Sequence, residues 1–172
     1  MNENMVKRSD KKAFYGVISG ENTVFTRMKH FTEISISKNP KEYSRQYVDE
    51  SQERTDVVGY SPSMSYNFDD FTGDAVLEDI VGITNGELLG TDAQREIVQV
   101  DFARPSDGGF YAVKRTFAVI ADSEGGETDN YTYSGTFKCV SSKVVGVATI
   151  VTPENGDSEN VETIEFAETV SE

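Results

Sequence analysis

Alternating apolar and polar residues occur in short runs along most of the chain and predict β-strands. In the run 60–70, for example, Met64, Tyr66 and Phe68 alternate with serine and asparagine. Gly-, Asp- and Ser-rich turns separate most of the runs, and this spacing is typical of a β-sandwich or barrel. The strands are expected at 13–18, 23–38, 60–70, 95–103, 111–121, 130–140 and 143–151.

One segment, 72–85, has helical periodicity instead. Leu77 and Ile80 belong to a one-sided apolar stripe, Thr72 is in position to cap the first turn, and Gly86 offers a left-handed stop. A single helix with one apolar stripe has to pack against a sheet. The predicted fold class is therefore mainly β, a β-sandwich or barrel-like domain with one flanking α-helix.

The longest interruption of the strand pattern is "NPKEYSRQYVDESQERTDVVGYSP", residues 39–62. Tight hairpin loops have about two to five residues, and longer irregular excursions are usually functional or disordered. Because tyrosine and arginine are enriched at interfaces, we predict an extended inter-subunit loop that packs on a second copy of the chain. A loop folded back on its own sheet is the alternative. The candidate contact residues are Tyr43, Arg45, Tyr47, Arg54 and Tyr60.

The ends of the chain are more polar than its middle. We expect residues 1–12 to form a flexible N-terminal arm, residues 13–152 one β domain, and residues 153–172 an acidic C-terminal tail that is flexible or orders on contact. The N-terminal residues lack the apolar stretch of a signal peptide, and no run reaches transmembrane length. We therefore expect a soluble product inside the cell with no membrane association.

Charge is unevenly distributed. The net charge is −14, but the first 48 residues carry nine Lys or Arg against five Asp or Glu (+4), and the rest carry seven against 25 (−18). This balance makes the chain a poor candidate for gripping DNA, which requires a basic footprint. Attraction between the basic front of one copy and the acidic back of another favours head-to-tail association.

Residue patterns that would support catalysis or metal binding are lacking. Cys139 lies in an alternating run and is expected to be a buried, inert thiol, and His30 is the single histidine. Neither a nucleophile–base pair nor a Cys/His zinc site can be assembled from them. The acidic segment 122–130 does not match the EF-hand calcium loop. We predict no enzyme activity, no metal and no cofactor.

The chain resembles one known family in five segments that occur in the same order between about residues 28 and 150. These segments are similar to the major tail tube protein of long-tailed, non-contractile bacteriophages of Gram-positive hosts. They are "KNPKEYSRQYVDE", "TDVVGYSPSMSYNFD", "DAVLEDI", "GTDAQREIVQVDF" and "AVKRTFAVIADSEGGETDNYTYSGTFK".

The resemblance implies a structural subunit of the virion tail, assembled in the host cytoplasm. Six copies would form a ring, and stacked rings would form a hollow tube in which residues 39–62 reach a neighbour. The implied partners are other copies, a tape measure protein in the lumen, and tail terminator and distal tail proteins at the tube ends. DNA would pass from capsid to host without specific binding, since a lumen of like charge repels phosphate.

Two other readings of the sequence remain open at this point. A phage-derived particle such as a tailocin would use the same kind of subunit. From a different class, a monomeric β-sandwich module that binds carbohydrate or calcium would also be rich in short strands and carboxylates. A tube subunit would form rings or rods, whereas a binding module would stay monomeric and be stabilised by its ligand.

Overall fold

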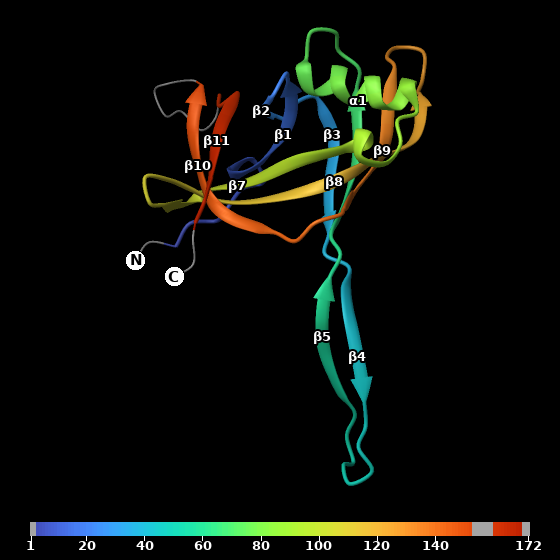
Figure 1. The fold of residues 1–172 in the computed structure, drawn as a ribbon, viewed down its shortest axis with the longest axis vertical. Coiled ribbons are helices and arrows are strands. Elements are labelled where there is room, and N and C mark those ends of the chain that lie inside the picture. Colours follow the sequence, from blue (N-terminus) through green and yellow to red (C-terminus); the bar gives the residue numbers. More distant parts are fainter. Residues whose placement is uncertain (1–2, 153–159, 170–172) are drawn as a thin grey trace.

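The computed structural model describes residues 3–152 and 160–169, and it consists mainly of antiparallel strands with one α-helix (Figure 1). A long two-stranded projection leaves the body at one end. In chain order the elements are η1 (Arg8–Asp10), β1 (Lys11–Ser19), β2 (Asn22–Arg27), β3 (Phe31–Ser37), β4 (Pro40–Arg45), β5 (Arg54–Tyr60), β6 (Ser63–Asp69), α1 (Ala75–Gly86), η2 (Gly90–Ala93), β7 (Gln94–Ser106), β8 (Gly109–Gly125), β9 (Thr132–Cys139), β10 (Val144–Thr152) and β11 (Thr163–Glu168).

The large sheet closes into a barrel over part of its width. It has nine strands in the order β10-β11-β2-β1-β7-β8-β9-β6-β3, and β10 also pairs with β8. The strands from β10 to β8 therefore form a closed ring, while β9, β6 and β3 continue as an open sheet. The length of β8 makes this possible, because Ala112 pairs with β10 and Val119 pairs with β9. The predicted mainly β, barrel-like fold with one flanking helix is confirmed.

Two apolar cores lie on opposite sides of the central strands. Successive side chains of a strand point to opposite faces, so Phe14 of β1 enters the barrel while Tyr15 packs under the helix. Val98 and Ile97 of β7 divide in the same way. The helix covers the second core with its buried stripe, which comprises Val76, Leu77, Ile80 and Ile83.

The helix begins later than the sequence predicted. Asp74, not Thr72, is the N-cap, and its carboxylate accepts hydrogen bonds from the backbone N–H groups of Val76 (3.0 Å) and Leu77 (3.4 Å). A carboxylate is favoured there because it satisfies two free donors and faces the positive end of the helix dipole. The helix ends at Gly86, and Glu87 adopts the left-handed C-cap conformation.

A buried polar network fastens the helix to the barrel. The Tyr15 hydroxyl donates to Asp79 Oδ2 at 2.5 Å, and Arg95 Nε donates to the same oxygen at 2.9 Å. Burial, and then the adjacent Asp79 carboxylate, raise the pKa of the Tyr15 phenol far above its ordinary value. The phenol therefore remains protonated and continues to donate to Asp79.

The ends of the chain differ from the expected flexible arm and tail. At the N-terminus, η1 and the first residues of β1 fall within 1–12. Near the C-terminus, β11 inserts between β10 and β2, where Ile164 pairs with both Ile150 and Phe25. Val161 and Ile164 are buried in the barrel core. Residues 153–159 and 170–172 of the expected tail lie outside the described residues.

The seam at β11 requires a small residue on its partner strand. A Cβ at Gly146 of β10 would lie 2.2 Å from the carbonyl oxygen of Ala167 and 2.5 Å from the Phe166 ring. Glycine lets the two strands approach while Phe166 covers the gap. The sequence did not predict this strand because acidic residues on and beside it, Glu162, Glu165 and Glu168, dominate the local composition.

The first prediction concerns the network at Asp79. Replacing Asp79 with alanine leaves a buried phenol and a guanidinium without their acceptor, which should cost about 2–3 kcal/mol of unfolding free energy. Urea denaturation followed by circular dichroism measures this change. The matched control is Glu78→Ala, an exposed position on the same helix, which should change stability by no more than about 0.5 kcal/mol. Equal effects of the two substitutions would show that the network does not stabilise the fold.

The second prediction concerns the barrel seam. A chain that ends at Thr152 loses β11, exposes the facing edges of β2 and β10, and removes two buried side chains worth about 1.5–3 kcal/mol each. Against a typical total of about 5–15 kcal/mol, the truncated chain should lose its cooperative thermal transition. Removal of residues 170–172 alone is the control and should leave the transition in place. An unchanged midpoint after truncation at Thr152 would contradict the role assigned to β11.

Candidate inter-subunit interface

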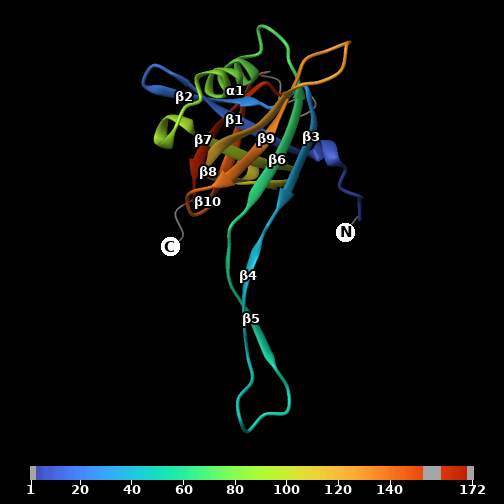
Figure 2. The same ribbon diagram turned by 90° about the vertical axis from the view of Figure 1, so that its right-hand side faces the viewer.

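Residues 39–62, predicted as an extended inter-subunit loop, contain the two paired strands of a β-hairpin. β4 and β5 pair only with each other, as a separate two-stranded sheet, and the hairpin projects from the body in both views (Figures 1 and 2). It continues the direction of the β3–β6 ladder. At the junction, the Asn39 side chain donates to the Ser61 carbonyl (3.1 Å) and the Ser63 hydroxyl (3.0 Å). The alternative of a loop folded back on its own sheet is therefore excluded.

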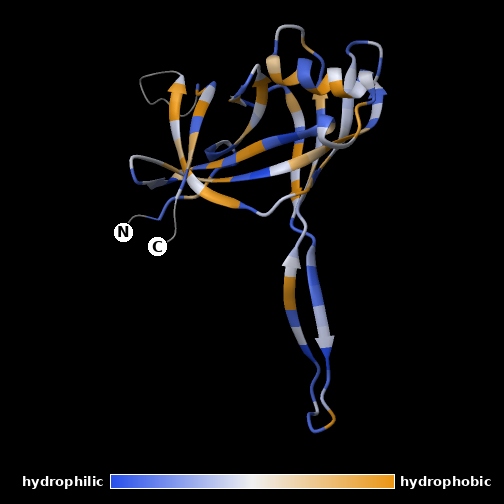
Figure 3. Cartoon of the chain, viewed as in Figure 1, coloured by the Kyte–Doolittle hydropathy of each residue, from blue (hydrophilic) through white to orange (hydrophobic). Residues whose placement is uncertain are grey.

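The alternation of apolar and polar residues did not predict the two hairpin strands, and the reason is physical. Alternation arises when one face of a strand is buried and the other is solvated. Most residues of β4 and β5 are exposed on both faces, including Tyr43 and Val57, so selection for burial leaves no period-two pattern. Hydrophilic residues accordingly dominate the projection, apart from short apolar stretches on β5 and near the tip (Figure 3).

Four of the five predicted contact residues gather in one cluster along the hairpin. The Arg45 guanidinium lies over the rings of Tyr43 (5.2 Å to the ring centroid) and Tyr47 (5.5 Å), and its Nε donates to the Tyr47 hydroxyl at 2.7 Å. Arg54 also approaches the Tyr47 ring, at 6.0 Å, and pairs with Glu50 at 2.7 Å. These contacts link β4, β5 and the tip to one another.

The hairpin exposes apolar surface that the isolated chain does not cover. Val57 and Val58 are 53% and 57% exposed, and Val48 at the tip is fully exposed. Tyr60, the fifth predicted contact residue, is 61% exposed and lies where the hairpin joins the body. Several exposed apolar and aromatic side chains on one projecting arm are typical of a surface that another protein covers.

An open sheet edge lies next to the hairpin. Among the described strands, β3 pairs with β6 on one side and with no strand on the other. Its backbone N–H and C=O groups on that side are available to a further strand. Ile36, near the end of β3, is 45% exposed. The hairpin and the β3 edge together form a continuous surface that is incomplete in one chain.

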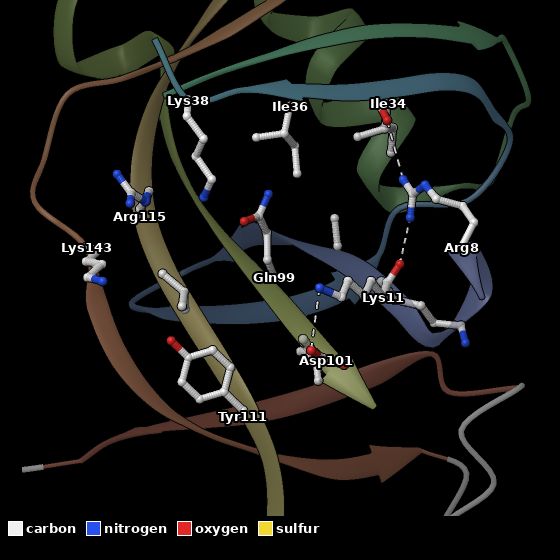
Figure 4. A pocket seen from close by; sticks show the side chains of 14 residues that line it. Arg8, Lys11, Ile34, Ile36, Lys38, Gln99, Asp101, Tyr111, Arg115 and Lys143 are labelled. Carbon is white, nitrogen blue, oxygen red and sulfur yellow. Dashed lines mark hydrogen bonds and ion pairs between the residues drawn. The ribbon is translucent and has the colours of Figure 1, made fainter. Parts of the chain in front are cut away.

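A basic cleft of about 380 Å³ lies between β3 and the barrel strands β1, β7 and β8 (Figure 4). One carboxylate, Asp101, lines it, and Lys11 and Arg104 already pair with that group. Within residues 3–152 and 160–169, no carboxylate lies within ion-pair distance of Lys38, Arg115 or Lys143. The cations that line the cleft are Arg8, Lys11, Lys12, Lys38, Arg115 and Lys143.

The two residues considered for catalysis have structural surroundings. His30 does not lie within a strand but in the turn before β3, with φ of 69°; its Nδ1 is 3.1 Å from Asp74 Oδ2, and its ring stacks on Phe71. Cys139 is half-buried, not fully buried as expected, and its thiol donates to the Ser141 carbonyl at 2.8 Å. His30 thus supports the N-cap of the helix.

The described residues contain neither a cluster of metal ligands nor a membrane-crossing helix. In the described part of the chain, no three His, Cys, Asp or Glu side chains gather in a way that could hold a metal ion. Across the same residues, no helix combines the length and the apolar character needed to cross a membrane.

Comparison with known proteins identifies a related fold. No protein-family model matches the chain, and no curated protein matches it either. Among solved structures, it is similar to the SPP1 tail tube, determined by solid-state NMR and cryo-electron microscopy, with a TM-score of 0.62. The match covers 82% of this chain and 78% of that chain at 10% identity. The resemblance inferred from the sequence segments is thus confirmed at the level of structure, and the chain has the fold of a phage tail tube protein.

Proposed function

We propose that this protein is a structural, non-enzymatic subunit of a phage tail tube. The observation that carries the proposal is the tail tube fold together with a paired hairpin that projects from the body and exposes tyrosine and valine side chains. In a monomer the apolar side chains of this hairpin would stay exposed to water, which is unfavourable. A subunit that covers the arm with an identical neighbour buries its apolar groups.

Assembly would give the open edge of β3 a hydrogen-bonding partner and would cover the exposed hairpin. The open edge of β3 would pair with a strand of the adjacent copy, so that six copies close a ring without free edges. The hairpin would contact a neighbouring copy through Tyr43, Tyr47 and Tyr60, with Arg45 and Arg54 holding its shape. Stacked rings then form a hollow tube in the virion tail.

The same proposal specifies the other partners. A tape measure protein would occupy the lumen during assembly in the host cytoplasm, and tail terminator and distal tail proteins would bind the two ends of the tube. DNA would later pass from the capsid to the host cell without specific binding. The net charge of −14 supports this role, because carboxylates facing the lumen repel phosphate and release it readily.

The third prediction tests the role of the hairpin. Purified full-length protein should form rings or hollow rods visible by negative-stain electron microscopy. A variant in which an Asn-Gly turn replaces residues 41–59 should fold with a thermal midpoint close to that of the full chain, because β4 and β5 pair only with each other. It should remain unassembled, since its inter-subunit arm is missing.

The control keeps both hairpin strands and changes only the tip, by Ser51→Gly with Gln52→Gly. This variant should assemble like the unmodified protein. Rods formed by the shortened variant would contradict the role of the hairpin. An unmodified protein that stays monomeric at high concentration and gains thermal stability from calcium or a glycan would instead support a binding module.

A further inference from the structure

Carboxylates cluster at the end of the body farthest from the hairpin. β6 starts beside the hairpin and ends at Asp69, whose neighbour Asp70 donates its backbone N–H to the Tyr131 carbonyl at 2.9 Å. The β8–β9 connection lies against these residues, and Asn130 donates to the Asp69 carboxylate at 2.5 Å. The acidic end, as we define it, comprises Asp69, Asp70, Asp122, Glu124, Glu127 and Asp129.

This acidic end has a strongly negative local field. No Lys or Arg occurs between residues 55 and 94 or between 116 and 137, which supply all of its side chains. Burial raises the pKa of the Tyr133 phenol, and the carboxylates of Glu124 and Asp70 raise it further. Glu124, Glu127 and Asp129 are exposed, so these charges face solvent or a partner.

The basic cleft lies at the opposite end, beside the hairpin. Lys38 immediately precedes Asn39 at the base of the hairpin. Lys143 lies in the connection after β9. The last residue of β9, Cys139, also reaches the hairpin base, where its backbone N–H donates to the Pro62 carbonyl. β8 links the two ends: Arg115 lines the cleft, and Glu124 belongs to the acidic end. At about 3.3 Å per residue, the strand separates these two positions by roughly 30 Å.

From this arrangement we propose that the basic cleft of one copy binds the acidic end of a second copy stacked on it in the same orientation. The inference rests on the proposed tail tube function. Each copy carries both surfaces at opposite ends, so the contact is head-to-tail and can repeat indefinitely. Lys38, Arg115 and Lys143, which have no carboxylate partner within the described ranges, would thereby gain one, and the hairpin would span the same junction.

The test reverses the charge of each surface separately and then of both. The cleft variant carries Lys38→Glu and Lys143→Glu, and the acidic-end variant carries Glu124→Lys and Glu127→Lys; all four positions are exposed. At concentrations where the unmodified protein forms rods, each variant alone should form only unstacked rings. The protein concentration needed for rods should rise at least tenfold. One chain with all four substitutions should form rods again, because the surfaces are again complementary.

The readouts are negative-stain microscopy, sedimentation and circular dichroism, the last to verify folding. Rod formation by the unmodified protein should weaken between 0.05 and 1 M NaCl (about 14 to 3 Å screening length), because exposed charges are screened by salt. The matched control, Glu165→Lys with Glu168→Lys on β11, changes the net charge as much as the acidic-end variant and should leave stacking intact.

Several outcomes would overturn the inference. One such outcome is that the cleft variant or the acidic-end variant stacks at the same concentration as the unmodified protein. The other is that the chain with all four substitutions fails to stack. The second result would point to a different occupant of the cleft, such as nucleic acid or another acidic protein. These failures are distinct from a failure of the proposed function, in which the unmodified protein would form neither rings nor rods.

Discussion

Backbone hydrogen bonding along β8 is the interaction on which the rest of the structure depends. This strand pairs with β7 on one side, and with β10 and then β9 on the other. The first partner change closes the barrel, and the second starts the open sheet that ends at β3. Because β10 closes the barrel on one end of β8, the strands β9, β6 and β3 that follow from its other end form an open sheet, and among the described strands the outer edge of β3 has no partner. The position of the incomplete edge is thus a consequence of how β8 divides its partners.

Burial explains which elements the sequence could predict. Met64, Tyr66 and Phe68 all enter the core, so β6 shows clear alternation, and the helix stripe is equally plain because one face packs on the sheet. The hairpin strands and β11 were missed for opposite reasons. β4 and β5 have no buried face, whereas Val161 and Ile164 are buried among acidic neighbours that dominate the composition. The N-cap was predicted at the wrong residue because threonine and aspartate are both residue types that favour this position. Only the backbone geometry shows that Asp74, and not Thr72, occupies it.

The candidate interface was only partly accessible from the sequence. The exposed tyrosines and arginines of residues 39–62 are visible in the composition, but the place of Arg54 opposite Arg45 depends on strand pairing. The basic cleft depends on residues from β1, β3, β8 and the segment before β10, which only the fold brings together. Charge asymmetry along the chain was visible, yet part of it is neutralised internally: Glu162 pairs with Lys29 at 3.1 Å and Arg27 at 3.7 Å. Glu124, Glu127 and Asp129 at the acidic end, in contrast, are exposed and available to other copies.

The pairing of β4 with β5 also matters for the energetics of the proposed assembly. Ordering a flexible segment of this length on binding would cost about 1–2 kcal/mol per residue in backbone entropy alone, more than a modest interface supplies. In this chain β4 and β5 are already paired, and the Arg45 guanidinium lies over the rings of Tyr43 and Tyr47. The exposed valines can therefore contribute their burial directly to association. In the proposed tube, a hairpin whose strands are already paired would bury its exposed side chains with little further ordering of its own backbone.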